Sequence, residues 1–349
     1  MNNNERINEI ETSMKAMRKE AYYKKEILQE LLDIQQEMVN HTFDKRHAEN
    51  IKLRLTDVVQ HLDQKNQEYG NVADEALQKF KDGCKCVSGM IGREIAGTTG
   101  EKFAFRSLET LKTDHIMLQN VELKNGKNRA ELDAVVITSK AIFLVEVKNS
   151  SHDMVIDAKG NYYRASGYMD FDYNIGEKVN NKEYLLRTAI DTSVLTDGKK
   201  QKTIVNLVVF ANSKIAVDNR YKYVQSCFLS QLPHIIDEYS GDDIYSNEAI
   251  NSIAECIRGA EYNETYSMDF NFTQFKKDFA TVMAILENAS VSKEEIILEK
   301  EEKGVKQEKI RREDIMSYIF SSKNAKYVGT AAAAVAIAFL TTADAIKHN

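Results

Sequence analysis

Apolar residues recur at intervals of three and four over the first part of the chain, which predicts amphipathic helices. Two heptad series hold Ile7, Met14, Ala21, Leu28 and Gln35, and Ile10, Met17, Lys24, Leu31 and Met38. A later series from Ile51 to Phe80 predicts a second helix, after a turn over residues 40–50. We therefore expect a helical region over 1–92. It would be a hairpin or coiled coil that forms a homo-oligomer, or a bundle packed on the chain's own next domain.

The pattern changes after residue 92 to short apolar runs between polar turns, which predicts strands. The runs are HIMLQNVEL, LDAVVIT, AIFLVEVK, YYRASGY, TIVNLVVFAN and YVQSCFLS. The Asn-Gly pair in KNGKNRA predicts a tight turn, and the almost wholly apolar TIVNLVVFAN is typical of a central strand. Amphipathic segments at GTTGEKFAFRSLETLKT and KEYLLRTAIDTSVL predict covering helices. This order of elements predicts an α/β domain over 93–245, a mixed sheet flanked by helices.

Helical periodicity returns over 246–320 and ends in a charged run, which we interpret as a solvated helix. Residues 321–349 are an alanine-rich tail in which 327–343 carry no charge. That length is near the minimum of about 17 residues for a membrane-spanning helix. Two interpretations stay open: a membrane anchor, and a small-residue helix packed closely in an oligomer or in the core.

The composition of the chain narrows its possible functions more than its possible folds. The chain has 349 residues, of which 43% are hydrophobic and 29% charged, with a net charge of −6. A surface that binds phosphates would therefore have to be local. The four cysteines lack zinc-ligand spacing and the start lacks an apolar signal segment. We expect a cytoplasmic protein, held at the cytoplasmic face of the membrane if the tail inserts.

Three charged residues lie inside or at the ends of the apolar runs LDAVVIT and AIFLVEVK. Because side chains alternate along a strand, Glu146 and Lys148 share one face with Leu144. The short Ser-Lys connection makes the strands antiparallel neighbours and brings Asp133 close to Glu146. Two adjacent carboxylates repel unless a cation lies between them, and such oxygen ligands suit Mg²⁺ or Mn²⁺. Lys148 would orient or activate a water, or stabilise developing negative charge.

Asp133, separated by twelve residues from Glu146-Val147-Lys148, resembles the D…ExK core of the PD-(D/E)xK nuclease superfamily. The segments GTTGEKFAFRSLETL, ELDAVVIT and AIFLVEVKNS together resemble the nuclease-related domain, NERD. In that domain a Gly-Glu pair opens the first helix, and these residues are Gly100-Glu101 here. The resemblance covers about residues 94–235 and implies a restriction-endonuclease-like core.

The resemblance also implies an activity, the metal-dependent hydrolysis of DNA phosphodiester bonds by a metal-activated water. Asp133 and Glu146 would be metal ligands, and the carbonyl of Val147 would complete the site. Glu101 would be an accessory metal ligand or would position the water, and Lys148 would serve the nucleophile. The family's Asn-Pro-x-x-Gln segment has only NNKEY as its nearest match, over 180–184. We therefore have no ground to place this helix at the active site.

Two groups of basic residues would neutralise phosphates near such a site, or are ordinary solvated surface. They are Lys124, Lys127 and Arg129, and Lys199, Lys200 and Lys202. No base-reading module is evident, so we expect contacts to the DNA backbone. The alternative function is a catalytically inactive or latent nuclease-like scaffold that oligomerises through its helices, at the membrane if the tail inserts. A measurement of metal binding would distinguish the nuclease from the scaffold.

Overall fold

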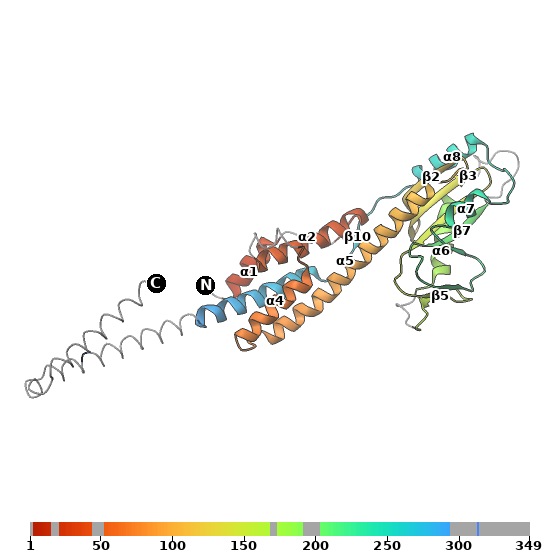
Figure 1. Ribbon diagram of the computed structural model, residues 1–349. Coiled ribbons are helices and arrows are strands. Elements are labelled where there is room, and N and C mark those ends of the chain that lie inside the picture. Colours follow the sequence, from red (N-terminus) through yellow and green to blue (C-terminus); the bar gives the residue numbers. More distant parts are fainter. Residues whose placement is uncertain are drawn as a thin grey trace, which may run out of the picture. The chain divides into compact units, whose positions relative to one another are not determined.

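The computed structural model describes residues 3–14, 21–43, 52–167, 173–190 and 203–293, together with Glu313 (Figure 1). The chain divides into two compact units. The first unit comprises Met1–Thr12, Gln60–Phe80 and Lys277–Asn349, and the second comprises Ser13–Val59 and Lys81–Lys276. The candidate membrane segment, 327–343, lies outside the described residues. Among the helices that are described, none combines the length and the apolar character needed to cross a bilayer.

The N-terminal region forms more helices than we predicted. They are α1 (Asn3–Ser13), α2 (Lys24–Thr42), α4 (Leu55–Glu68) and α5 (Asp74–Leu108). The prediction of one heptad helix through residue 21 is wrong, because Ala21–Tyr22 is a strand, β1, paired with β10 (Tyr266–Ser267). The single helix expected up to Phe80 is also interrupted. Gly70 and Asn71, with φ of 82° and 63°, form a turn between α4 and α5, since this conformation ends helices.

The apolar side of α2 is covered within the monomer. Leu31, Ile34 and Met38 are each 0% exposed. A helix whose apolar stripe is already buried does not need a second copy to cover it. This burial favours the bundle arrangement for α2, whereas the coiled coil and the homo-oligomer stay predictions.

The first unit is a helical assembly held by aromatic and ionic contacts. The rings of Phe80 and Phe279 lie 5.3 Å apart, centroid to centroid. Arg6 donates to both carboxylate oxygens of Glu287, at 2.7 and 3.0 Å. Phe279 and Glu287 both lie on a helix over 272–293, as the periodicity predicted.

The second unit is built on a mixed sheet, as the sequence predicted (Figure 1). The sheet has five strands. Its order is β2-β3-β4-β7-β9, with β2, β3 and β4 antiparallel and β7 and β9 parallel to β4. The strands are β2 (His115–Asn125), β3 (Asn128–Thr138), β4 (Ile142–Lys148), β7 (Ile204–Phe210) and β9 (Gln225–Phe228). Gly126, at φ 63°, makes the predicted tight turn between β2 and β3.

Alternation along β4 divides the core into two layers. Ile142 and Leu144 belong to the layer that includes α6 and α8, and Phe143 and Val145 belong to the layer that includes α5 and α7. The helices are α6 (Ile175–Ala189), α7 (Leu232–Asp237) and α8 (Asn247–Gly259). The sheet is therefore buried on both faces, with β4 in its centre.

A smaller sheet has the order β6-β5-β8. Its strands are β5 (Met154–Ile156), β6 (Tyr162–Arg164) and β8 (Val217–Asn219). The strand β6 confirms the short strand predicted at YYRASGY. At the start of the α/β region, α5 continues through residues 92 and 93, where we expected one region to end and the next to begin.

Candidate active site

Asp133 lies in the middle of β3, at a point where the alternation of faces is interrupted. Leu132 and Val135 belong to the same core layer although they are three residues apart. The pairing of β2 with β3 leaves out Asn120 and Asp133, because Gln119 pairs with Ala134 and Val121 pairs with Leu132. Asn120 has a φ of 50°. Such local irregularities re-aim a side chain. Asp133 turns toward the layer that includes α6.

The carboxylate of Asp133 also continues the sheet beyond its backbone pairing. The pairing of β3 with β4 reaches Ala134 and Val145. At the next step, Oδ2 of Asp133 accepts a hydrogen bond from the backbone N–H of Val147, at 2.7 Å. This bond fixes the side chain of Asp133 beside Glu146.

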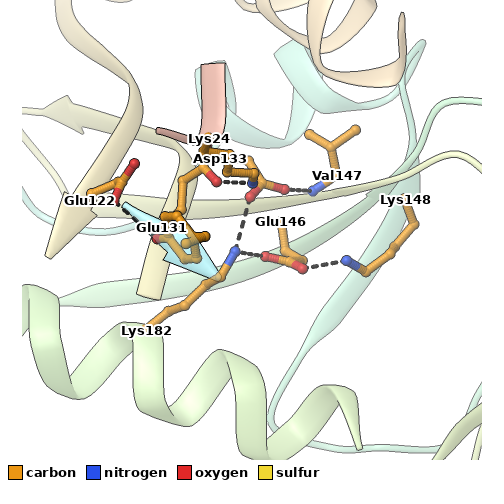
Figure 2. A network of polar contacts seen from close by, with 9 residues as sticks. Lys24, Glu122, Glu131, Asp133, Glu146, Val147, Lys148 and Lys182 are labelled. Atoms are coloured by element: carbon orange, nitrogen blue, oxygen red, sulfur yellow. Dashed lines mark hydrogen bonds and ion pairs between the residues drawn. The ribbon is translucent and has the colours of Figure 1, made fainter. Parts of the chain in front are cut away.

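The ammonium group of Lys182 lies between the two carboxylates (Figure 2). Its Nζ donates to Oδ1 of Asp133 at 2.9 Å and to Oε2 of Glu146. A cation between the carboxylates was predicted, but the chain itself supplies the one seen here.

Lys182 is the site residue that the sequence reasoning missed. It lies on α6, the helix that we had no ground to place at the active site, and the structure corrects that view. A signal was present, because Lys182 comes three residues after Val179 and three before Leu185, both buried. A lysine in the middle of the apolar face of a helix must find a buried partner.

Glu146 is the most buried carboxylate at the site, with a side chain 5% exposed. It accepts from Lys148 through Oε1 and from Lys182 through Oε2. Burial by itself raises the pKa of Glu146, but the two ammonium groups outweigh it and lower the pKa to about 2. Burial lowers the pKa of Lys148, whereas Glu146 raises it, and the net result lies above the usual range. Both groups are therefore charged at neutral pH.

Gly100 explains why a Gly-Glu pair occurs in α5. A Cβ at this position would lie 2.9 Å from Cβ of Asn149 and 3.5 Å from Cγ1 of Val147. Only glycine lets α5 approach the end of β4 this closely. The approach places the next residue, Glu101, in the cavity of Asp133. Burial first, and then the charge of Asp133, raise the pKa of Glu101.

A cavity of about 720 Å³ encloses these groups. Its lining includes Glu101, Asp133, Glu146, Lys148 and Lys182. We call it the site cavity. All four members of the predicted Glu101, Asp133, Glu146 and Lys148 set thus lie in one place.

Of the two short paired strands β1 and β10, β10 lines the site cavity with Tyr266 and Ser267, and Lys24 and Met268 beside the pair line it too. We call this pair the β1–β10 strap. Lys24 forms an ion pair with Glu131, and the hydroxyl of Tyr266 donates to Oε2 of Glu122 at 3.0 Å (Figure 2). Segments from the N-terminal and C-terminal sides of the α/β domain are therefore tied to β2 and β3 next to the site.

The oxygen atoms at the site are of the type that binds a hard divalent cation. Two carboxylates converge on one cation position and a third, Glu101, lines the same cavity, and such oxygen ligands suit Mg²⁺ or Mn²⁺. Within the described part of the chain, no three His, Cys, Asp or Glu side chains are close enough to form a ready metal cluster. Ligation by Asp133, Glu146, Glu101 and the carbonyl of Val147 stays a prediction.

The predicted phosphate-binding residues divide into three cases. Lys124 donates to Glu264 at 2.8 Å, so its charge is partly used. Arg129 lies over the ring of Tyr266, 4.4 Å from the centroid, and lines the site cavity, whereas Lys127 is exposed. The other three lie outside the described residues: Lys199, Lys200 and Lys202.

Residues 96–211 match the family model of the nuclease-related domain, NERD. The matched segment contains the four predicted site residues and also Lys182. Comparison of the chain with curated proteins and with solved structures gives no match.

Proposed function

Because residues 96–211 of this chain form a nuclease-related domain, we propose that the protein is a metal-dependent nuclease that hydrolyses the phosphodiester bonds of DNA. One observation carries the proposal. Asp133 and Glu146 converge on a single buried cation position, and Lys148 is held against the other oxygen of Glu146. Clustered carboxylates with a lysine at the end of a strand suit hydrolysis of a phosphodiester.

The residues that would hold the divalent cation are Asp133, Glu146 and Glu101, with the carbonyl of Val147. Such a cation, when bound, supplies a Lewis acid and lowers the pKa of a bound water. The chain's own groups do the rest. The hydrogen bond from Val147 orients Asp133, and Glu146 anchors the ammonium of Lys148. Anchored in this way, Lys148 can neutralise charge that develops on the phosphate.

The test is cleavage of linear, circular and single-stranded DNA, with RNA for comparison, in Mn²⁺, Mg²⁺ or EDTA. Wild type is compared with Asp133→Asn, Glu146→Gln and Lys148→Met. We expect metal-dependent cleavage by wild type and a loss of at least about 100-fold in each variant, the scale on which a positioned catalytic group acts. Asparagine at 133 keeps an oxygen that can accept from Val147, so the sheet edge is preserved.

The matched control is Glu255→Gln, which removes a carboxylate from the surface of α8, where it pairs with Arg258. This variant should cleave like wild type. Cleavage that persists in EDTA, or that survives in all three site variants, would contradict the proposal.

A latent or inactive scaffold is the second candidate, and the position of Lys182 favours it. An ammonium group that bridges Asp133 and Glu146 occupies the place of the predicted metal. If wild type binds no Mn²⁺ and cleaves no substrate while Lys182→Met does both, the site is latent. If neither protein binds metal, the fold serves as a scaffold.

A further inference from the structure

A second cavity, of about 590 Å³, adjoins the site cavity. The two cavities share Gly97, Val147, Lys148 and Tyr173 in their linings. No residue of the β1–β10 strap lines the second cavity. We call it the basic groove, and its walls come from α5, the end of β4, and β6.

The charge of the basic groove is of one sign. Arg93, Lys148 and Arg164 line it together with His152, and its lining contains no Asp or Glu. The lining of the site cavity is mixed. It holds four carboxylates, Glu101, Glu131, Asp133 and Glu146, and five basic residues, Lys24, Arg129, Lys148, Lys178 and Lys182. A polyanion is therefore attracted to the basic groove, where no carboxylate opposes the positive side chains. Since Lys148 borders both, a phosphate at the end of the groove would lie beside the carboxylates.

The wall from α5 leaves room for a ligand backbone. Gly89, Gly92 and Gly97 lie on this wall, and a Cβ at Gly92 would meet nothing within 4 Å. The wall from β6 is aromatic, with Tyr162 and Tyr163. Aromatic side chains in nucleic-acid grooves stack on unpaired bases, whose faces are accessible, whereas a duplex shows only base edges in its grooves.

The volume of the groove also favours a single strand of nucleic acid over a duplex. Cavities of about 300–1,000 Å³ hold small ligands, so 590 Å³ suits a few nucleotides rather than a duplex. We propose that the basic groove binds a single strand of DNA, with phosphates at Arg93 and Arg164 and a base against Tyr163. That the strand is DNA, and that it reaches the carboxylates for cleavage, rests on the proposed nuclease function, whereas the binding of a single strand does not.

The experiment measures binding in EDTA, so that no hydrolysis occurs. Fluorescence anisotropy follows a labelled single-stranded oligonucleotide, its duplex and the RNA of the same sequence. The variants are Arg93→Glu, Arg164→Glu and Tyr163→Ala. The matched control is Lys102→Glu, because position 102 is nine residues beyond Arg93 in α5 and so lies on the opposite side of the helix.

We expect single-stranded DNA to bind more tightly than the duplex or the RNA. Each arginine variant should bind more weakly and lower the slope of log K against log salt by about 0.7 for each phosphate that the variant no longer neutralises. Tyr163→Ala should weaken binding at least about fivefold. Lys102→Glu should bind like wild type. Arg164→Gln replaces Arg164→Glu if thermal unfolding shows that the reversed charge disturbs the fold.

Equal or tighter binding of the duplex would overturn the single-strand assignment, and tighter binding of RNA would overturn the assignment to DNA. Unchanged binding in all groove variants would overturn the site. Cleavage in Mn²⁺ separates this proposal from the proposed function. Groove-dependent binding without cleavage contradicts the nuclease alone, whereas cleavage that the groove variants leave intact contradicts the groove alone.

Discussion

The Nζ of Lys182 lies 2.9 Å from Oδ1 of Asp133, although the two residues are 49 positions apart in the chain. The same ammonium group contacts Glu146, so one positive charge serves two carboxylates. A lysine and a metal ion cannot occupy that point together. The identity of residue 182 should therefore set how strongly the site binds a metal.

Lys182→Met should bind Mn²⁺ at least about tenfold more tightly than wild type, a difference of about 1.4 kcal/mol. The variant loses a positive charge beside the ligands and no longer has an ammonium group to displace. Isothermal titration calorimetry measures the affinity. Mn²⁺ should also raise the unfolding temperature of the variant more than that of wild type, because a ligand stabilises the folded state more as its saturation rises.

The control for this prediction is Lys178→Met. Lys178 also lines the site cavity, but its Nζ lies over the ring of Tyr173, 3.7 Å from the centroid. Its removal should change the Mn²⁺ affinity far less. Equal affinity in wild type and Lys182→Met would show that Lys182 does not compete for the cation position.

Acid should remove the stability that Glu146 contributes. Its folded-state pKa is about 2, since the ammonium groups outweigh burial, and its unfolded value is about 4.3. The folded protein then binds fewer protons than the unfolded chain between these values. The contribution is complete above about pH 4.3 and is lost as the pH falls toward about 2.

Urea unfolding at a series of pH values checks this prediction. Between about pH 5 and pH 2, the free energy of unfolding of wild type should fall more steeply than that of Glu146→Gln. The largest difference in slope that one group can give is about 1.4 kcal/mol per pH unit. Glu255→Gln should follow wild type, and parallel curves for wild type and Glu146→Gln would refute the prediction.

Gly100→Ala should destabilise the second unit by about 1–3 kcal/mol, because the added Cβ would lie 2.9 Å from Cβ of Asn149. Gly92→Ala adds the same methyl group to the same helix, where nothing lies within 4 Å. That variant should gain up to about 1 kcal/mol from the higher helix propensity of alanine. Chemical unfolding measures both. Equal stability of the two variants would show that α5 does not depend on a close approach at Gly100.

The mixed sheet, one of its antiparallel pairs and one of its central strands followed from patterns within short segments. The alternation in AIFLVEVK placed Glu146 and Lys148 on one face, and the apolar run of β7 predicted a central strand. These features depend on residues two positions apart, so the sequence contains them directly. The antiparallel pairing of β3 with β4 followed from the short connection between them.

The remaining features depend on contacts between distant segments. Ala21–Tyr22 leaves its heptad because it pairs with Tyr266–Ser267, and the sequence of the first segment contains no sign of the second. Lys182 meets Asp133 only once α6 has packed on the sheet. Periodicity identified α6 but not which of its polar side chains is buried against a partner.

The hydrogen bond from Val147 to Asp133 gives the site a reporter of its own. A backbone amide exchanges its proton with solvent only when its hydrogen bond opens, and this amide is held by a carboxylate rather than by a neighbouring strand carbonyl. The exchange rate of the Val147 amide proton therefore reports whether the carboxylate of Asp133 accepts its hydrogen bond. Isotope exchange at this one proton would follow ligand binding at Asp133 without a label, a substrate or turnover.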